Sequence, residues 1–253
     1  MLYNMDIESM NEIAFDLYAN YLKNEEIKEL LPIRKIRFVE DFPGEVLKAQ
    51  PELKTKSGID EEQLKNYSGY TVLFPDNTAE ILIEKNGSMD NFFWCGTLIH
   101  EITHVRDFAD YINILHYNRF DEMLKCSYFW YWTEFHAKYK GYIYMLNFVD
   151  KLSDKYKNPY VEDTLHRIYN FNNTVQQQIN CYQKIYITVH MIGEILAYEQ
   201  SSIVMPDNFY KCIIEKFEWF EGVKDFLEKH TETITIEEML ILSLNLKINL
   251  NKY

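Results

Sequence analysis

Residues 96–115 have apolar side chains at the spacing of one helix face, so they predict a helix packed on a core. On the opposite face, at 100° per residue, His104 lies about 40° from His100. Two histidines four residues apart on one face can direct both imidazoles at a single metal ion. The segment therefore predicts a core helix that also carries a metal site. Its alternative is an ordinary helix with two hydrogen-bonded or exposed histidines.

The acidic residues of this helix suggest further roles. Glu101 lies about 100° from His100, near such an ion but not aimed at it, which suits a base that acts on a metal-bound water. Asp107 shares the histidine face and is a candidate to accept a hydrogen bond from an imidazole N–H. The alternative for Asp107 is a solvated acid on the helix surface.

A catalytic zinc ion usually takes three protein ligands, so a third one is needed. Glu134 follows His104 by 30 positions, which leaves room for a turn and a second helix. Ala137 and Gly141 lie on the same side as Glu134 and would let the two helices approach closely. Asp110 is the alternative third ligand, but an unbroken helix turns it away from the histidine face.

The pattern His100-Glu101-x-x-His104, followed by Glu134-x-x-Ala137 on a helix, resembles the gluzincin metallopeptidases. Within that class it is most similar to the minigluzincin and ImmA/IrrE-like group, over about residues 70–150. The resemblance implies that His100, His104 and Glu134 bind Zn²⁺. It also implies that Glu101 is the general base in the hydrolysis of a peptide or protein substrate.

The hydrophobic pattern predicts an α+β fold that is mostly helical. A small antiparallel or mixed sheet would pack on the metal-site helix, and a helical C-terminal region would follow. We expect a core with the N-terminal helix and sheet in residues 1–150, and helices in residues 151–253. The expected helices span about 6–30, 90–116, 120–150, 160–200, 207–229 and 235–250, and the expected strands are "KIRFVED", "YTVLF" and "AEILIEK". The last strand alternates like a half-buried strand, and we expect it to border the cleft and pair with an extended peptide.

Composition narrows the class of partner and the compartment. The formal net charge is −13 and no dense basic run occurs, which argues against nucleic-acid binding. The first residues show no secretory signal, and the most apolar helical segment, "IYITVHMIGEILAY", is too short to span a bilayer. Four widely spaced cysteines suit reduced thiols. These features predict a cytoplasmic protein that does not insert in a membrane, and they leave its oligomeric state open.

Three functions fit the sequence. The first is a zinc-dependent metalloendopeptidase, in which the metal acidifies a water and Glu101 takes its proton. The second is a zinc-binding but non-proteolytic protein with a regulatory or recognition role. The third is a helical interaction module without a metal. His190 and His136 are candidates to stabilise an oxyanion, although a structural role is more typical of such residues.

Overall fold

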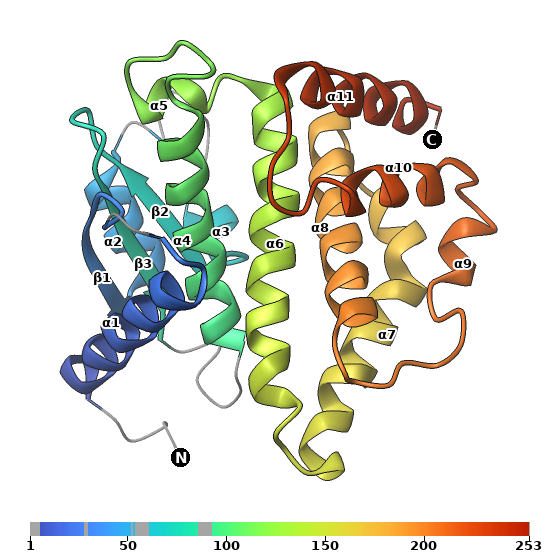
Figure 1. Ribbon diagram of the computed structural model, residues 1–253, viewed down its shortest axis with the longest axis horizontal. Coiled ribbons are helices and arrows are strands. Elements are labelled where there is room, and N and C mark those ends of the chain that lie inside the picture. The colour runs from blue at the N-terminus through green and yellow to red at the C-terminus, as the bar shows by residue number, and fades with distance from the viewer. Residues whose placement is uncertain (1–5, 28–29, 52, 54–60, 86–92, 253) are drawn as a thin grey trace. The chain divides into compact units, whose positions relative to one another are not determined.

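A computed structural model describes residues 6–27, 30–51, 53, 61–85 and 93–252 of the chain. The chain divides into two compact units, residues 1–125 and 126–253. All the described strands belong to the first unit, and the described part of the second is helical (Figure 1). The predicted fold class is confirmed: the protein is mostly helical, with a three-stranded mixed sheet packed against helices.

The sheet of the first unit contains β1 (Ile33–Val39), β2 (Gly69–Leu73) and β3 (Ala79–Glu84). The strand order is β1-β3-β2, with β3 parallel to β1 and antiparallel to β2. Because β3 is paired on both sides, it has no free edge for a peptide, so the expected strand addition to "AEILIEK" is wrong.

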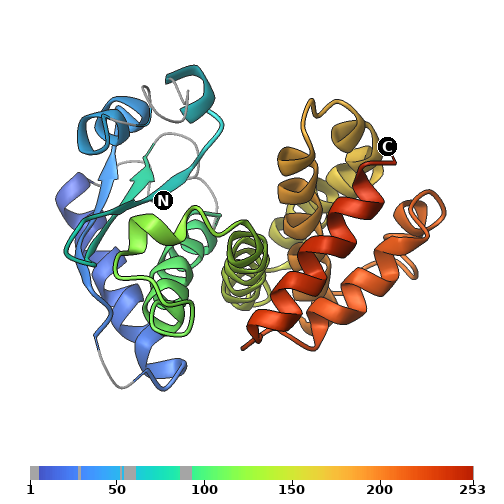
Figure 2. The ribbon, with the colours of Figure 1, turned by 90° about the horizontal axis from the view of Figure 1, so that it is seen from above.

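Both faces of the sheet are covered by helices. On one face, Val72 and Leu82 pack against residues from α2 (Phe42–Ala49) and α3 (Glu61–Leu64). The other face packs against α4 (Phe93–Tyr111), with α1 (Ile7–Asn24) beside β1 and α4 (Figure 2). Leu82 is fully buried, so the predicted half-buried character of β3 is also wrong. Alternation failed as a signal because a helix covers each face.

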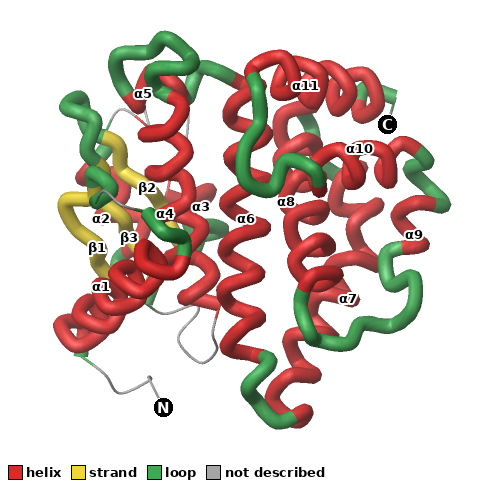
Figure 3. The backbone as a smooth tube through the Cα atoms, in the orientation of Figure 1, coloured by secondary structure: helices red, strands yellow, loops and turns green. Residues whose placement is uncertain are grey.

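The second unit is built around α6 (Ser127–Val149) and α8 (Cys181–Gln200), which pack on each other along most of their length. Gly193 permits this close approach, because a Cβ there would lie 3.0 Å from the carbonyl oxygen of Phe135 and from the amide nitrogen of Tyr139. Helices α7 (Asp154–Gln176) and α11 (Ile236–Leu250) pack against this pair, and α10 (Trp219–Glu228) lies beside α11 (Figures 1 and 3).

Several predicted helices are shorter than expected. The segment 120–150 forms α5 (Phe120–Met123) and α6, and 207–229 forms α9 (Lys211–Ile214) and α10. The segment 160–200 is two helices rather than one, because Asn180 caps α8 by accepting a hydrogen bond from the Gln183 amide. The helix expected at 235–250 is confirmed as α11, and that expected at 90–116 is α4, although residues 90–92 lie outside the described part.

The expected division at residue 150 differs from the boundary between the compact units. Helix α6, which we expected in the core of residues 1–150, belongs to the second unit. The division into a peptidase core and a helical region concerns function as well as packing, and it stays a prediction. Among the described residues, no helix combines the length and the apolar character needed to cross a bilayer.

The close packing at Gly193 gives a test of the fold. We expect Gly193→Ala to lower the free energy of unfolding by about 1–3 kcal/mol, because the added methyl group pushes α6 and α8 apart. Gly222→Ala is the matched control in α10, where an added Cβ meets no atom within 4 Å. That control should be neutral or stabilising by up to about 1 kcal/mol, since alanine favours a helix. Urea unfolding of both variants measures the difference, and equal effects would contradict the packing described.

Candidate metal centre

Helix α4 is buried on both of its sides. Its apolar side packs on the sheet, with Leu98, Ile102 and Val105 fully buried. The side that carries His104 is also withdrawn from solvent, and this histidine is only 4% exposed. A buried imidazole needs a hydrogen-bond partner or a metal, so the histidine side of α4 is a candidate site.

The two histidines of α4 converge as the helical spacing predicts. The Nε2 atoms of His100 and His104 are 3.0 Å apart. Their rings are nearly perpendicular, with centroids 4.6 Å apart. Both Nε2 lone pairs can therefore be directed to one point, as two ligands of the same ion require.

The side chain of Glu101 points to the sheet and contacts strand β2. The hydroxyl of Thr71 donates a hydrogen bond of 2.7 Å to Oε2 of Glu101. Gly69 leaves space for the same carboxylate, because a Cβ there would lie 2.9 Å from Oε1. Burial raises the pKa of Glu101 to about 7, and the bond from Thr71 opposes that shift. A carboxyl group that titrates near neutral pH can both accept and release a proton.

The two aspartates of α4 lie in different surroundings. Asp107 is 1% exposed, so it is not the solvated surface acid of the alternative reading, and a hydrogen bond from an imidazole to it stays a prediction. The side chain of Asp110 is 59% exposed, with Oδ2 lying 3.7 Å from Nε of Arg106. Asp110 therefore faces solvent, where we expected an unbroken helix to turn it.

In the second unit, a glutamate and a histidine from two different helices are hydrogen-bonded to each other. Nε2 of His190 on α8 and Oε2 of Glu134 on α6 are 2.7 Å apart and hydrogen-bonded. Glu134 is 4% exposed, and the ring of Tyr186 lies 4.0 Å from that of His190. Sequence reasoning favoured a structural role for His190. The available signal was a histidine and a glutamate that interrupt the most apolar helical segment of the chain.

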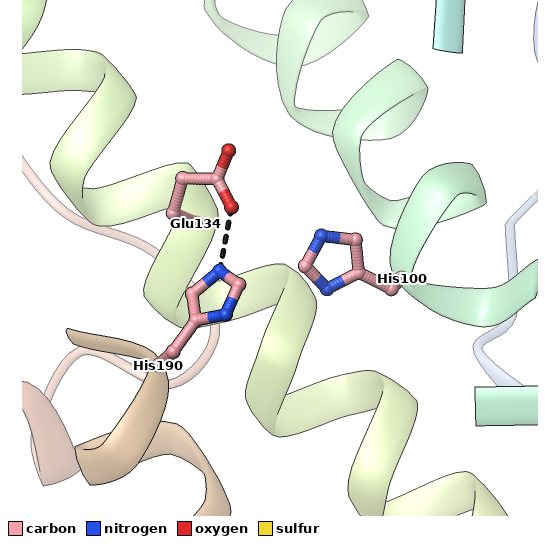
Figure 4. A group of neighbouring side chains, drawn as sticks. All are labelled: His100, Glu134 and His190. Atoms are coloured by element: carbon pink, nitrogen blue, oxygen red, sulfur yellow. Dashed lines mark hydrogen bonds and ion pairs between the residues drawn. The ribbon is translucent and has the colours of Figure 1, made fainter. Parts of the chain in front are cut away.

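His100, Glu134 and His190 form a group that could hold a metal ion. One ligand atom from each residue lies within 4.8 Å of those of the other two (Figure 4). Two of the three predicted ligands, His100 and Glu134, are in this group. His104, the remaining predicted ligand, adjoins it through the 3.0 Å approach of its Nε2 to that of His100. The predicted alternative ligand Asp110 is not part of it.

A buried ionic network lies one helical turn beyond His190. Glu194 is 2% exposed and accepts a hydrogen bond of 2.8 Å from the hydroxyl of Thr164. The guanidinium of Arg167 also donates to Glu194, and its Nη2 donates a bond of 2.9 Å to the hydroxyl of Tyr142. These bonds join α7 to α8 and to α6, so they restrict the movement of the helix that carries His190.

No family model, curated protein or solved structure matches this chain.

The bond between Thr71 and Glu101 predicts a pH-dependent effect in the metal-free protein. Burial raises the pKa of Glu101, so the folded protein binds a proton at this carboxyl more tightly than the unfolded chain does. The stabilisation that results is complete below about pH 4.5 and is lost as pH rises through about 7. Thr71→Val removes a donor to the ionised carboxylate and raises this pKa further. We expect the variant to lose about 1–3 kcal/mol more at pH 8 than at pH 5.

Urea unfolding of the metal-free protein at both pH values measures this effect. The control is Thr71→Val in a Glu101→Gln background, where the difference between the two pH values should vanish. If it persists in that background, a group other than Glu101 causes it.

Proposed function

We propose that this protein is a zinc-dependent hydrolase of peptide bonds. The observation that carries the proposal is the position of Glu101, a buried carboxylate next in sequence to a histidine of the group that could hold a metal ion. A structural metal site needs ligands only, whereas a hydrolytic site also needs a base close to the ion. Thr71 of β2 donates a hydrogen bond to Glu101, Gly69 leaves room for it, and Glu101 is not one of the residues that could hold the ion, so its carboxylate is available as a base.

The donor atoms suit zinc in kind and in spacing. Imidazole nitrogen and carboxylate oxygen are common zinc ligands. Two ligands of a tetrahedral zinc ion, each about 2.1 Å from it, lie about 3.4 Å apart. The His100–His104 separation of 3.0 Å is slightly shorter. A small side-chain rotation would open this pair to the required spacing.

In this proposal, His100, His104 and Glu134 hold the ion, as the resemblance to the gluzincins implies. Zinc, when bound, would polarise the peptide carbonyl and make a water molecule more acidic. Glu101 takes a proton from that water and passes it to the leaving amine. His190 is hydrogen-bonded to Glu134, so it orients this ligand and lies close enough to act on the substrate.

Strand β2 is the best candidate to bind an extended peptide. It is an edge strand, because within the described part of the chain it pairs with β3 only. The residues that contact Glu101, Gly69 and Thr71, belong to this strand. A peptide paired with the edge of β2 would lie along the strand that positions the proposed base.

The second candidate is a zinc-binding protein without peptidase activity. The observation that favours it is His190, which belongs to the metal-binding group and would supply a fourth protein ligand. Four protein ligands close a zinc site and leave no place for a water, as in structural sites. The two candidates therefore differ in one respect, which is whether His190 binds the ion.

The first test concerns the base. We expect one zinc per chain in the purified protein and in Glu101→Gln, because this residue holds no ion in the proposal. Hydrolysis of a peptide library should fall at least about 100-fold in the variant, since the proton acceptor is lost. Elemental analysis and a mass-spectrometric cleavage assay give the two readouts. Glu12→Gln, at an exposed glutamate of α1, is the control. Unchanged hydrolysis in Glu101→Gln would contradict the mechanism.

The second test separates the two candidates at His190. If this residue acts beside the ion, His190→Ala keeps one zinc per chain and loses about 100-fold or more in kcat. If it is a fourth ligand, the variant binds zinc more weakly, as measured by competition with a chelator. His166→Ala, at an exposed histidine of α7, should change neither quantity. Wild-type protein that binds zinc but cleaves no peptide would support the non-proteolytic candidate.

A further inference from the structure

Helix α11 is apolar on two sides, but only one of them is covered. Its buried side is formed by Met239, Leu242, Leu246 and Leu250. A second set of aliphatic side chains faces solvent, and we call it the α11 stripe. It consists of Leu240, Ile241, Leu244 and Ile248, which are 43%, 49%, 59% and 58% exposed. The spacing of four residues aligns Leu240, Leu244 and Ile248 along one side of the helix.

The two ends of the α11 stripe have opposite charges. Glu237 lies in the first turn of α11, and Lys252 follows its last turn. At 100° per residue, Glu237 lies about 20° from Leu244, and Lys252 lies in the turn two residues beyond Leu250, so the two charges mark opposite ends of the stripe. Both are exposed, and neither has an ion-pair partner within the described part of the chain. The order along the helix is therefore acidic, aliphatic and basic.

This order is complementary to itself when one helix is reversed. On two antiparallel copies of α11 related by a two-fold axis near Leu244, Leu240 of one copy lies opposite Ile248 of the other. The same axis brings Glu237 of each copy to Lys252 of the other, at both ends of an interface about 22 Å long. A parallel arrangement would instead place like charges together at each end.

We propose that the α11 stripe is a docking surface for a second copy of this chain, with the two α11 helices antiparallel. This docking surface is independent of the metal centre, because it consists of residues 237–252 only. A membrane surface is a poorer occupant, since interfacial helices carry a polar face rich in lysine and arginine. Helix α11 has one basic residue, Lys247, and two acidic residues in its first turn.

Association through this surface is weak and reversible. Four partly exposed aliphatic side chains form a small contact, which places the interface among the transient ones. The net charge of −13 on each chain adds a repulsion that opposes association. Moderate salt screens this long-range repulsion more than it weakens the apolar contact, so the dimer should persist at physiological ionic strength.

Sedimentation equilibrium of the full chain, from low micromolar to several hundred micromolar protein, tests the proposal. We expect a reversible monomer–dimer equilibrium for the wild type. Leu244→Glu should remain monomeric throughout, because two glutamates would meet at the two-fold axis. The matched control is Ile179→Glu, at an isoleucine that is 98% exposed outside α11, and it should dimerise like the wild type. Circular dichroism checks that each variant keeps its helix content.

A charge exchange tests the antiparallel arrangement. Glu237→Lys alone should weaken dimerisation by about tenfold, because it turns two attractive pairs into two repulsive ones. Adding Lys252→Glu should restore the wild-type affinity. The double variant opposes the helix dipole at both ends of α11, so a restored dimer cannot result from a more stable helix. A monomeric wild type, a dimer that tolerates Leu244→Glu, or a double variant that fails to recover would each overturn the proposal.

Discussion

The burial of α4 on both sides is the constraint from which the candidate site follows. The side toward the sheet is apolar and needs no partner other than close packing. The opposite side carries His104 and Asp107, which are almost fully withdrawn from water. Burying polar groups without partners costs several kcal/mol, so such a helix is stable only where its polar side is satisfied. Two contacts satisfy polar groups of this helix. Nε2 of His100 approaches Nε2 of His104, and the hydroxyl of Thr71 donates to Glu101.

The sheet matters to the site through two small residues of one strand. Gly69 lacks the Cβ that would collide with Glu101, and Thr71 supplies the hydroxyl that Glu101 accepts. The carboxylate, on the residue that follows His100, is thereby fixed against β2, and it is not part of the group that could hold a metal ion. In the function that we propose, this carboxylate is the base, and its absence from the ligands is what distinguishes a hydrolytic site from a purely structural one. The close packing of α6 and α8 at Gly193 has a comparable role, because it brings Glu134 and His190 within hydrogen-bond distance.

The accuracy of the sequence predictions depended on whether the signal was local. Helix α11 was predicted almost to the residue, because its periodic apolar residues lie within the segment itself, where a capping box at Thr235 also fixes its start. The break between α7 and α8 was missed, since no proline or glycine marks it and only Asn180 caps the new helix. The expectation that "AEILIEK" offers a free edge to a peptide was wrong, because strand order depends on pairing between distant segments.

The sequence by itself determined the positions of His100, Glu101 and His104 on one helix, because helical periodicity relates residues only a few positions apart. It also identified Glu134 as a candidate, through its distance along the chain and the small residues that follow it. Only the tertiary structure decided that His190 joins His100 and Glu134, and that β2 rather than β3 is the edge strand near Glu101. Residues 190 and 134 are 56 positions apart, and no local pattern encodes which helix packs against which. That choice is made by packing of the whole chain.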